Sequence, residues 1–175
     1  PKKNFSVEVL TTGDGNLPGV RFVPANGKMK RYLKFFWAAF TLSRRFDVVY
    51  AVDSSFGAAT IAAFAARLCR KTFIMRVTGD YAWEQGVQRF GVSELLDDFA
   101  PSDEPRRYRW QVRLLARAER YAARRAAAIV APSEYLKRIV ETWGVAPEKI
   151  HVIHNAVDVP AIAETKKDIR ERLEW

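Results

Sequence analysis

Hydrophobic and polar residues alternate along this chain in short runs that switch between the period of a strand and the period of a helix. Apolar or alternating runs predict β-strands over residues 5–12, 20–24, 46–53, 71–78, 127–131 and 150–153. Helical spacing of apolar residues predicts helices over residues 28–45, 56–70, 107–126 and 133–143. Residues 79–105 contain Gly86, Gly91, Pro101 and Pro105, and we expect them to be irregular.

This alternation predicts an α/β fold, a Rossmann-like parallel sheet with helices on both faces. Right-handed connections place the C-terminal ends of all strands at one edge of such a sheet, and ligands bind there. Residues that directly follow a predicted strand are therefore the candidates for substrate contact. They are Asp53, Ser54, Asp80, Tyr81, Trp83, Glu84, Ser133, His154 and Asn155.

Asp80 is the candidate catalytic residue, because a carboxylate at this edge can hydrogen-bond an acceptor hydroxyl and orient it. The alternative is a turn aspartate that stabilises its own loop. Tyr81 and Trp83 beside Glu84 suit the apolar face and the hydroxyls of a sugar, although Trp83 can equally anchor its loop in the core. Ser133 precedes a predicted helix and is expected to cap it.

Composition limits the protein class. The chain has 175 residues, 49% of them hydrophobic, which is enough for one globular domain and excludes a disordered chain. A single cysteine, Cys69, excludes an internal disulfide, and with only two histidines no structural zinc site is expected, nor any other metal. A reducing cytoplasm is the simplest setting. No run of 18 apolar residues predicts a membrane span, and residues 1–4 do not open a signal peptide.

Positive charge is concentrated in two segments. The formal net charge is +9, and the excess lies in residues 1–45 and 106–125. In the first predicted helix, a basic face flanked by an aromatic residue is typical of a helix on an anionic membrane. The expected membrane contacts are Lys30, Arg31, Lys34 and Trp37, with Met29, Leu33, Phe36 and Phe40 as the core stripe. A peripheral location on the cytoplasmic face of the inner membrane follows as an expectation.

The second basic segment is a stripe of arginines on one helix face: Arg109, Arg113, Arg117, Arg120 and Arg124. A solvated face is one interpretation, with ion pairs to Glu94, Asp97, Asp98, Asp103 and Glu104. The alternative is a non-catalytic nucleic-acid-binding domain, but neither a known RNA-binding motif nor a helix-turn-helix supports it. Glu119 falls on the apolar face of the same helix, where it must find a hydrogen-bonding partner.

A motif over residues 129–158 carries a family resemblance. A strand ends before Ser133, a helix of the type SxxLK follows, and a Gly-Val-x-x-x-Lys-Ile turn leads to a strand and then to Asn155 and Asp158. The matching residues are Ser133, Leu136, Lys137, Gly144, Val145, Lys149, Ile150, Asn155, Val157 and Asp158. This order and spacing resembles the end of the N-terminal domain in glycosyltransferases of family 4, which have the GT-B architecture.

The resemblance implies that residues 1–158 form the acceptor-binding domain of a retaining, metal-independent glycosyltransferase. Residues 159–175 would then be the interdomain linker and the start of the nucleotide-sugar-binding domain. The implied partners are a nucleotide-sugar donor as co-substrate, a glycan or lipid-linked acceptor, and the C-terminal domain of the same enzyme, without a cofactor. Because that domain holds most of the donor contacts, we expect this chain to be inactive alone.

The sequence departs from the family pattern in several places. Gly79-Asp80 stands where members often carry a histidine, so a histidine contact to the donor cannot be transferred. Ala156 replaces the usual glycine after Asn155. Neither the first strand with its Gly-rich loop nor the Glu-x7-Glu pair is found, so the chain is expected to begin at the second strand of the fold.

Overall fold

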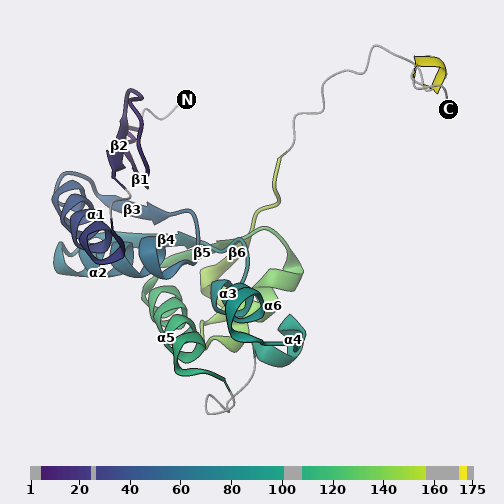
Figure 1. Cartoon of the computed structure of the whole chain (residues 1–175). Coiled ribbons are helices and arrows are strands. Elements are labelled where there is room, and N and C mark those ends of the chain that lie inside the picture. The colour runs from purple at the N-terminus through teal and green to yellow at the C-terminus, as the bar shows by residue number, and fades with distance from the viewer. Residues whose placement is uncertain (1–4, 25–26, 101–107, 157–169, 173–175) are drawn as a thin grey trace.

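The computed structural model describes residues 5–24, 27–100, 108–156 and 170–172. Its main sheet has four parallel strands in sequential order, β3 (Val48–Ala51), β4 (Thr72–Arg76), β5 (Ala128–Ala131) and β6 (Ile150–Val152) (Figure 1). A second parallel pair is formed by β1 (Val9–Thr12) and β2 (Val20–Val23). The α/β fold class with parallel strands flanked by helices is confirmed.

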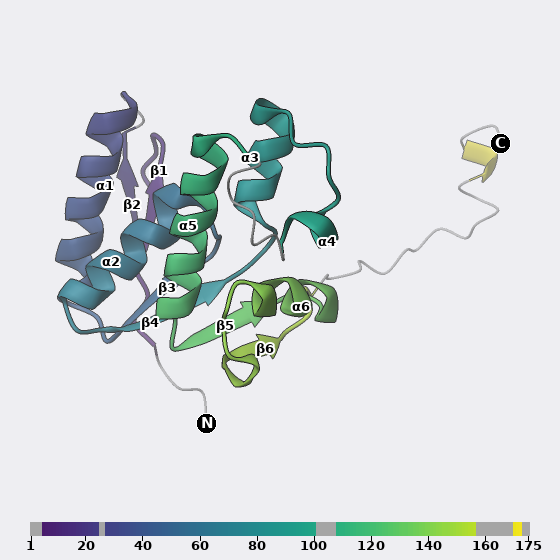
Figure 2. The same ribbon diagram turned by 90° about the horizontal axis from the view of Figure 1, so that it is seen from below.

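Helices connect successive strands. They are α1 (Lys28–Ser43), the π-helical turn η1 (Phe56–Thr60), α2 (Ile61–Leu68), α5 (Trp110–Arg125) and α6 (Glu134–Thr142), with a short 3-10 turn η3 (Pro147–Lys149) before β6. Parallel strands in sequential order with right-handed crossovers place the connecting helices on the same face. Figure 2 shows α2, α5 and α6 in front of the sheet.

The core lies between this face and the helices. In β4 and β5 every second residue is buried, including Phe73 and Met75 of β4 and Ile129 of β5, and these pack with alanines of η1, α2 and α5. The intervening strand residues Val48 and Tyr50 are about half exposed. The loops at the strand ends are thus carried by a well-packed scaffold.

The expectation that residues 79–105 are irregular is wrong. This segment contains α3 (Tyr81–Phe90) and α4 (Leu96–Phe99). Gly91 ends α3 in a left-handed conformation at φ 74°, which makes it a C-terminal cap. Gly86 lies inside α3. A Cβ at this position would come within 2.8 Å of the Val92 side chain, which explains why the residue is a glycine. Both glycines therefore belong to helix α3 or to its cap, although the sequence pattern predicted that they interrupt regular structure.

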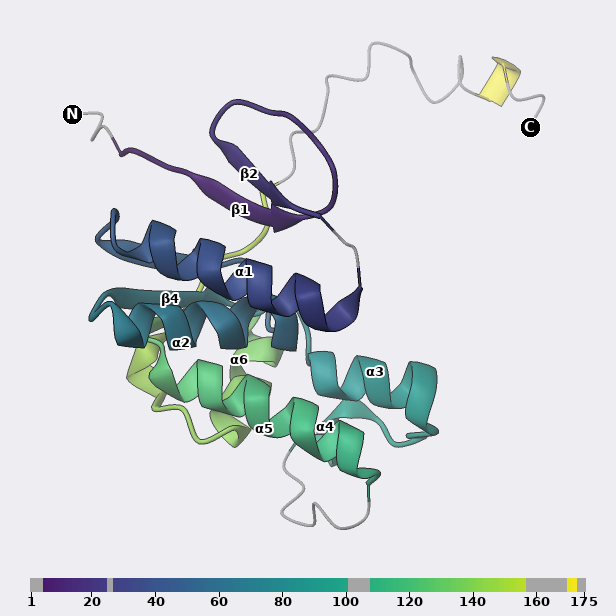
Figure 3. The same cartoon turned by 60° about the vertical axis from the view of Figure 1, so that its left-hand side comes forward.

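The expected core stripe of α1 is also wrong. Phe35, Ala38, Ala39 and Leu42 are buried, whereas Met29 and Leu33 are 74% and 56% exposed. Figure 3 shows α1 between the β1–β2 pair and α2, and Phe35 and Ala38 pack with Val23 of β2. Apolar residues nearly surround this helix, so their spacing does not identify the buried face. No helix in the described ranges is long and apolar enough to cross a bilayer.

Candidate functional site

Two loops meet at the C-terminal edge of the main sheet. Asp53 and Ser54 follow β3, and Gly79 and Asp80 follow β4; since these strands are parallel neighbours, their loops lie together. The buried Ser54 hydroxyl donates to the Gly79 carbonyl oxygen at 3.1 Å. The carboxylate of Asp53 accepts from the backbone N–H of Ser55. The two predicted substrate-binding segments are therefore tied directly to each other.

Buried carboxyl groups fix the start of α3 within this edge. Asp80 is 3% exposed, and its Oδ1 accepts from the backbone N–H of Trp83 at 2.8 Å, so Asp80 caps the helix. Glu119 of α5 is 2% exposed and accepts from the backbone N–H groups of Tyr81 and Ala82 at 3.0 and 3.2 Å. The sequence predicts that Glu119 needs a hydrogen-bonding partner near the core, and the first turn of α3 is that partner.

The same burial sets the protonation of this pair. Desolvation raises the pKa of Glu119 well above its ordinary value, and the negative charge of Asp80 raises it further. Desolvation also raises the pKa of Asp80, while the hydrogen bond from Trp83 and the charge of Arg120 lower it. Glu119 is therefore the carboxyl that holds a proton most strongly.

Tyr81, the first residue of α3, is half-buried and directly follows Asp80. Burial is the largest cause that raises the pKa of Tyr81. The neighbouring Tyr32 and Asp53 raise this pKa further, whereas the charges of Arg89 and Arg31 lower it. The Tyr32 ring meets Phe56 edge-on at 5.8 Å. The sheet edge thus combines phenol groups, a carboxylate and guanidinium groups, which together can hydrogen-bond several hydroxyls.

Glu84 and Trp83 have different positions in α3. The exposed Glu84 side chain folds over Gly79, and a Cβ at Gly79 would collide with its carboxylate. Trp83 donates from its indole Nε1 to the Glu94 carbonyl oxygen at 2.9 Å and packs beside Val112 and Phe99. Its alternative interpretation, a loop anchor, fits this geometry, while Glu84 stays at the open edge.

The remaining predicted contacts lie at the ends of β5 and β6. Ser133 caps α6 by accepting from the backbone N–H of Leu136 at 3.2 Å. His154 Nδ1 lies 3.0 Å from the Pro132 carbonyl oxygen, and Asn155 accepts from Arg76 of β4. Within the described part of the chain, none of these hydrogen bonds reaches Asp53, Asp80 or Tyr81.

Sequence reasoning missed Tyr32 and Arg89 and assigned Arg31 to the membrane surface. Arg31 is half-buried, its guanidinium lies 5.2 Å from the centre of the Tyr32 ring, and its charge lowers the pKa of Tyr81. Lys30, Lys34 and Trp37 are exposed as expected. The spacing of residues along the sequence does not distinguish Arg31 from Lys30, Lys34 and Trp37, because the direction of each side chain depends on how α1 packs.

The arginine stripe of α5 is partly occupied within the protein. Arg120 donates to the Ala100 carbonyl oxygen at 3.0 Å, and Arg124 donates to that of Arg120 at 3.3 Å. Of the acidic residues expected to pair with it, Asp97 accepts from Tyr135 at 3.0 Å, and Asp103 and Glu104 lie outside the described residues. The stripe is therefore interrupted, which weighs against a continuous phosphate-binding track.

A cavity of about 260 Å³ lies at the other end of α3. Its lining residues are Phe90, Gly91, Val92, Glu94, Tyr108 and Arg109. Since α3 begins at the sheet edge with Tyr81 and ends at Phe90, the length of the helix separates this cavity from the candidate site.

Comparison with known proteins gives a family and a fold. Residues 1–160 match the model of the family described as Glycosyltransferase Family 4. The crystal structure of Anabaena Alr3699/HepE in complex with UDP is similar, with a TM-score of 0.58 and 18% identity over 89% of this chain. The complex with UDP-glucose has a TM-score of 0.57 and 16% identity over the same share. This chain covers 36% of either structure, and no curated protein matches it.

Proposed function

The chain belongs to glycosyltransferase family 4, and from this premise we propose that it forms the acceptor-binding side of an enzyme that moves a sugar, with retention of configuration, from a nucleotide-sugar donor to an acceptor hydroxyl. The observation that carries the proposal is the pairing of the loops after β3 and β4. Ser54 bonds to Gly79 across the two loops, and the resulting edge presents Asp53, Tyr81 and Glu84 together.

Each of these side chains has a role in holding the acceptor. A sugar offers hydroxyl groups and an apolar ring face, and Tyr81 with Tyr32 can meet both kinds of surface. The carboxylates of Asp53 and Glu84 accept hydrogen bonds from hydroxyls and so orient the attacking oxygen. Ser133, His154 and Asn155 extend this edge toward β6 and the acceptor's far end.

The sequence predicts Asp80 as the catalytic residue. The geometry of its side chain defines the role that we propose for it. Its carboxylate is buried and caps α3, so it fixes the position of Tyr81, which directly follows it, from beneath the site. Stabilisation of the departing phosphate falls to groups outside these residues, in the nucleotide-sugar-binding domain. No metal ion is needed for the roles proposed for the chain's own residues.

A uridine nucleotide sugar is the first donor to test, because the similar Anabaena structures hold UDP, glucose or UDP-glucose. The assay uses the natural protein that contains this chain, with release of UDP as readout and the anomeric configuration of the product read by NMR. We expect Tyr81→Phe and Asp53→Asn each to raise the KM for the acceptor about tenfold or more, with the KM for the donor nearly unchanged.

Tyr121→Phe is the matched control, because Tyr121 lies near the end of α5, which leads into the start of β5 at the opposite edge of the sheet. Its acceptor KM should stay within about twofold of the parent value. Absence of transfer from every nucleotide sugar, or an inverted product, would contradict the proposed reaction. Equal effects of the Tyr81 and Tyr121 variants would instead leave the reaction but remove this edge as the acceptor site.

A further inference from the structure

An apolar surface lies exposed over α1 and α2. Met29, Leu33 and Trp37 follow one another at four-residue spacing along α1 and are 74%, 56% and 60% exposed. On the neighbouring α2, Phe64 and Leu68 have the same spacing and are 42% and 52% exposed. Exposed large side chains on adjacent helices, rather than single ones, indicate an interaction site.

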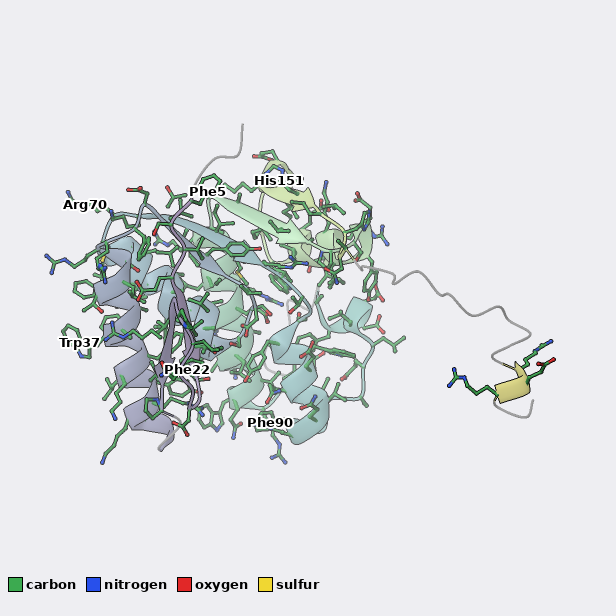
Figure 4. All side chains as sticks on the ribbon, turned by 90° about the horizontal axis from the view of Figure 1, so that it is seen from above. Phe5, Phe22, Trp37, Arg70, Phe90 and His151 are labelled. Carbon is green, nitrogen blue, oxygen red and sulfur yellow. The ribbon has the colours of Figure 1, made fainter. Side chains whose placement is uncertain are left out.

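Aromatic contacts make this surface continuous. The Phe36 ring lies 5.8 Å from that of Trp37 and 5.9 Å from that of Phe64, and so joins α1 to α2. Phe40 lies 5.9 Å from Trp37. Figure 4 shows Trp37 pointing outward from α1, away from the rest of the protein. We name these side chains the α1–α2 surface: Met29, Leu33, Phe36, Trp37, Phe40, Phe64 and Leu68.

Positive charge borders the α1–α2 surface. At about 100° per residue, Lys30 and Lys34 lie roughly 20° and 60° from Trp37 around the helix axis, on the side away from α2. Both are exposed, as are Arg67 and Arg70 of the α2 segment. Residues 28–45 and 56–71 contain no acidic residue, so no charge on these segments offsets the basic groups.

Two basic residues of α1 and its end do not belong to this border. Arg31 lies against Tyr32 at the candidate site. Arg45 forms an ion pair with Glu8 at 3.9 Å. The border therefore consists of Lys30, Lys34, Arg67 and Arg70, together with Arg44, whose guanidinium lies 6.0 Å from the centre of the Phe40 ring.

We propose that the α1–α2 surface binds peripherally to an anionic membrane. Trp37, Leu33 and Met29 enter the interfacial layer, while Lys30 and Lys34 meet the headgroups. Charge complementarity decides the occupant: a second copy would bring two basic borders together and be repelled. A nucleic acid would meet the lysines but would gain nothing from the aliphatic Met29 and Leu33. This inference rests on α1 and α2 and is independent of the proposed reaction.

Flotation with vesicles of phosphatidylcholine, with and without about one-third phosphatidylglycerol, tests the proposal. We expect the chain to bind the anionic vesicles and to be released by salt. Leu33→Ser with Trp37→Ser should lower the partition coefficient at least tenfold. Trp110→Ser is the matched control, because Trp110 is 67% exposed on α5, and it should change binding less than twofold.

The contribution of the lysine charges to vesicle binding is tested in the same flotation assay. Lys30→Gln with Lys34→Gln should weaken binding about thirtyfold, from ~1 kcal/mol for each lysine. Arg117→Gln with Arg138→Gln removes the same charge from exposed positions on α5 and α6 and should have little effect. All four sites are exposed, so circular dichroism should show folded variants.

Four outcomes would overturn the proposal. The first is equal binding to neutral and anionic vesicles. The second is a loss of binding in the Arg117 and Arg138 variant as large as that in the lysine variant. The third is a parent dimer in sedimentation equilibrium that Trp37→Ser dissociates, because the α1–α2 surface would then bind a second copy. Binding to heparin that persists in the Leu33 and Trp37 variant, without any vesicle binding, would likewise assign the border to another polyanion.

Discussion

Asp80 and Glu119 both accept hydrogen bonds from the first turn of α3. Asp80 accepts from the backbone N–H of Trp83, and Glu119, which is 39 positions later on α5, accepts from those of Tyr81 and Ala82. The first N–H groups of a helix have no partner within it, and here two buried carboxyls supply the partners. The direction of α3, and of Tyr81 with it, thus depends on a residue of α5.

Removal of Glu119 should destabilise the chain. Glu119→Ala leaves the N–H groups of Tyr81 and Ala82 buried without their acceptors, which costs about 2–4 kcal/mol of the free energy of unfolding. Glu119→Gln keeps one acceptor oxygen and should cost less than half as much. Urea denaturation measures both, with the exposed Glu134→Ala as control at about 0.5 kcal/mol or less. Equal losses in the Ala and Gln variants would contradict a hydrogen-bonding role.

Stability should fall as pH rises through the pKa of Glu119. Because burial raises this pKa, the folded chain keeps the proton to a higher pH than the unfolded chain does. The contribution is fully present below the unfolded value and is lost as pH passes the folded one. Asp80 shifts in the same direction. We expect Glu119→Gln to gain stability relative to the parent as pH rises above 4.5, the ordinary pKa of a glutamate, as measured by urea denaturation. Parallel curves for the two proteins would exclude this linkage.

Substitutions of Asp80 separate its capping role from a direct role in the reaction. Asp80→Ala removes the cap of α3 and should cost about 1–2 kcal/mol. Asp80→Asn keeps an acceptor oxygen for Trp83 and should cost less. If Asp80 only positions Tyr81, the Asn variant retains most of its kcat in the natural enzyme. A loss of kcat of a hundredfold or more in a fully folded Asn variant would show that the charge itself acts on the reacting groups.

The sequence was sufficient to predict the strands, because each is a short apolar run bounded by turn residues, as Val48–Ala51 and Thr72–Arg76 are. Parallel pairing and the position of Ser54 and Gly79 at one sheet edge followed from the same pattern, whereas their direct hydrogen bond is a finding of the structure. α3 could not be predicted, because its glycines are explained only by tertiary structure: Gly86 by the close approach of Val92, and Gly91 by the end of the helix.

The position of the candidate site could be predicted from the sequence, but not all of the residues that form it. Asp80, Tyr81 and Glu84 lie at the sheet edge because they follow a strand. Tyr32 lies inside α1, and only the packing of α1 brings it near Tyr81. Arg89 lies in the last turn of α3 and acts on Tyr81 through its charge. The burial of Asp80 was equally hidden, because it depends on Glu119 and the rest of α5.

Trp83 should contribute to stability through one hydrogen bond that Trp110 lacks. Trp83→Phe keeps an aromatic ring against Phe99 and Val112 but leaves the Glu94 carbonyl without the indole donor. We expect a loss of about 1–2 kcal/mol in the free energy of unfolding by urea denaturation. Trp110→Phe changes the same residue type at a 67% exposed position and should cost about 0.5 kcal/mol or less. Comparable losses in both variants would show that ring volume, rather than the bond to Glu94, holds this end of the loop.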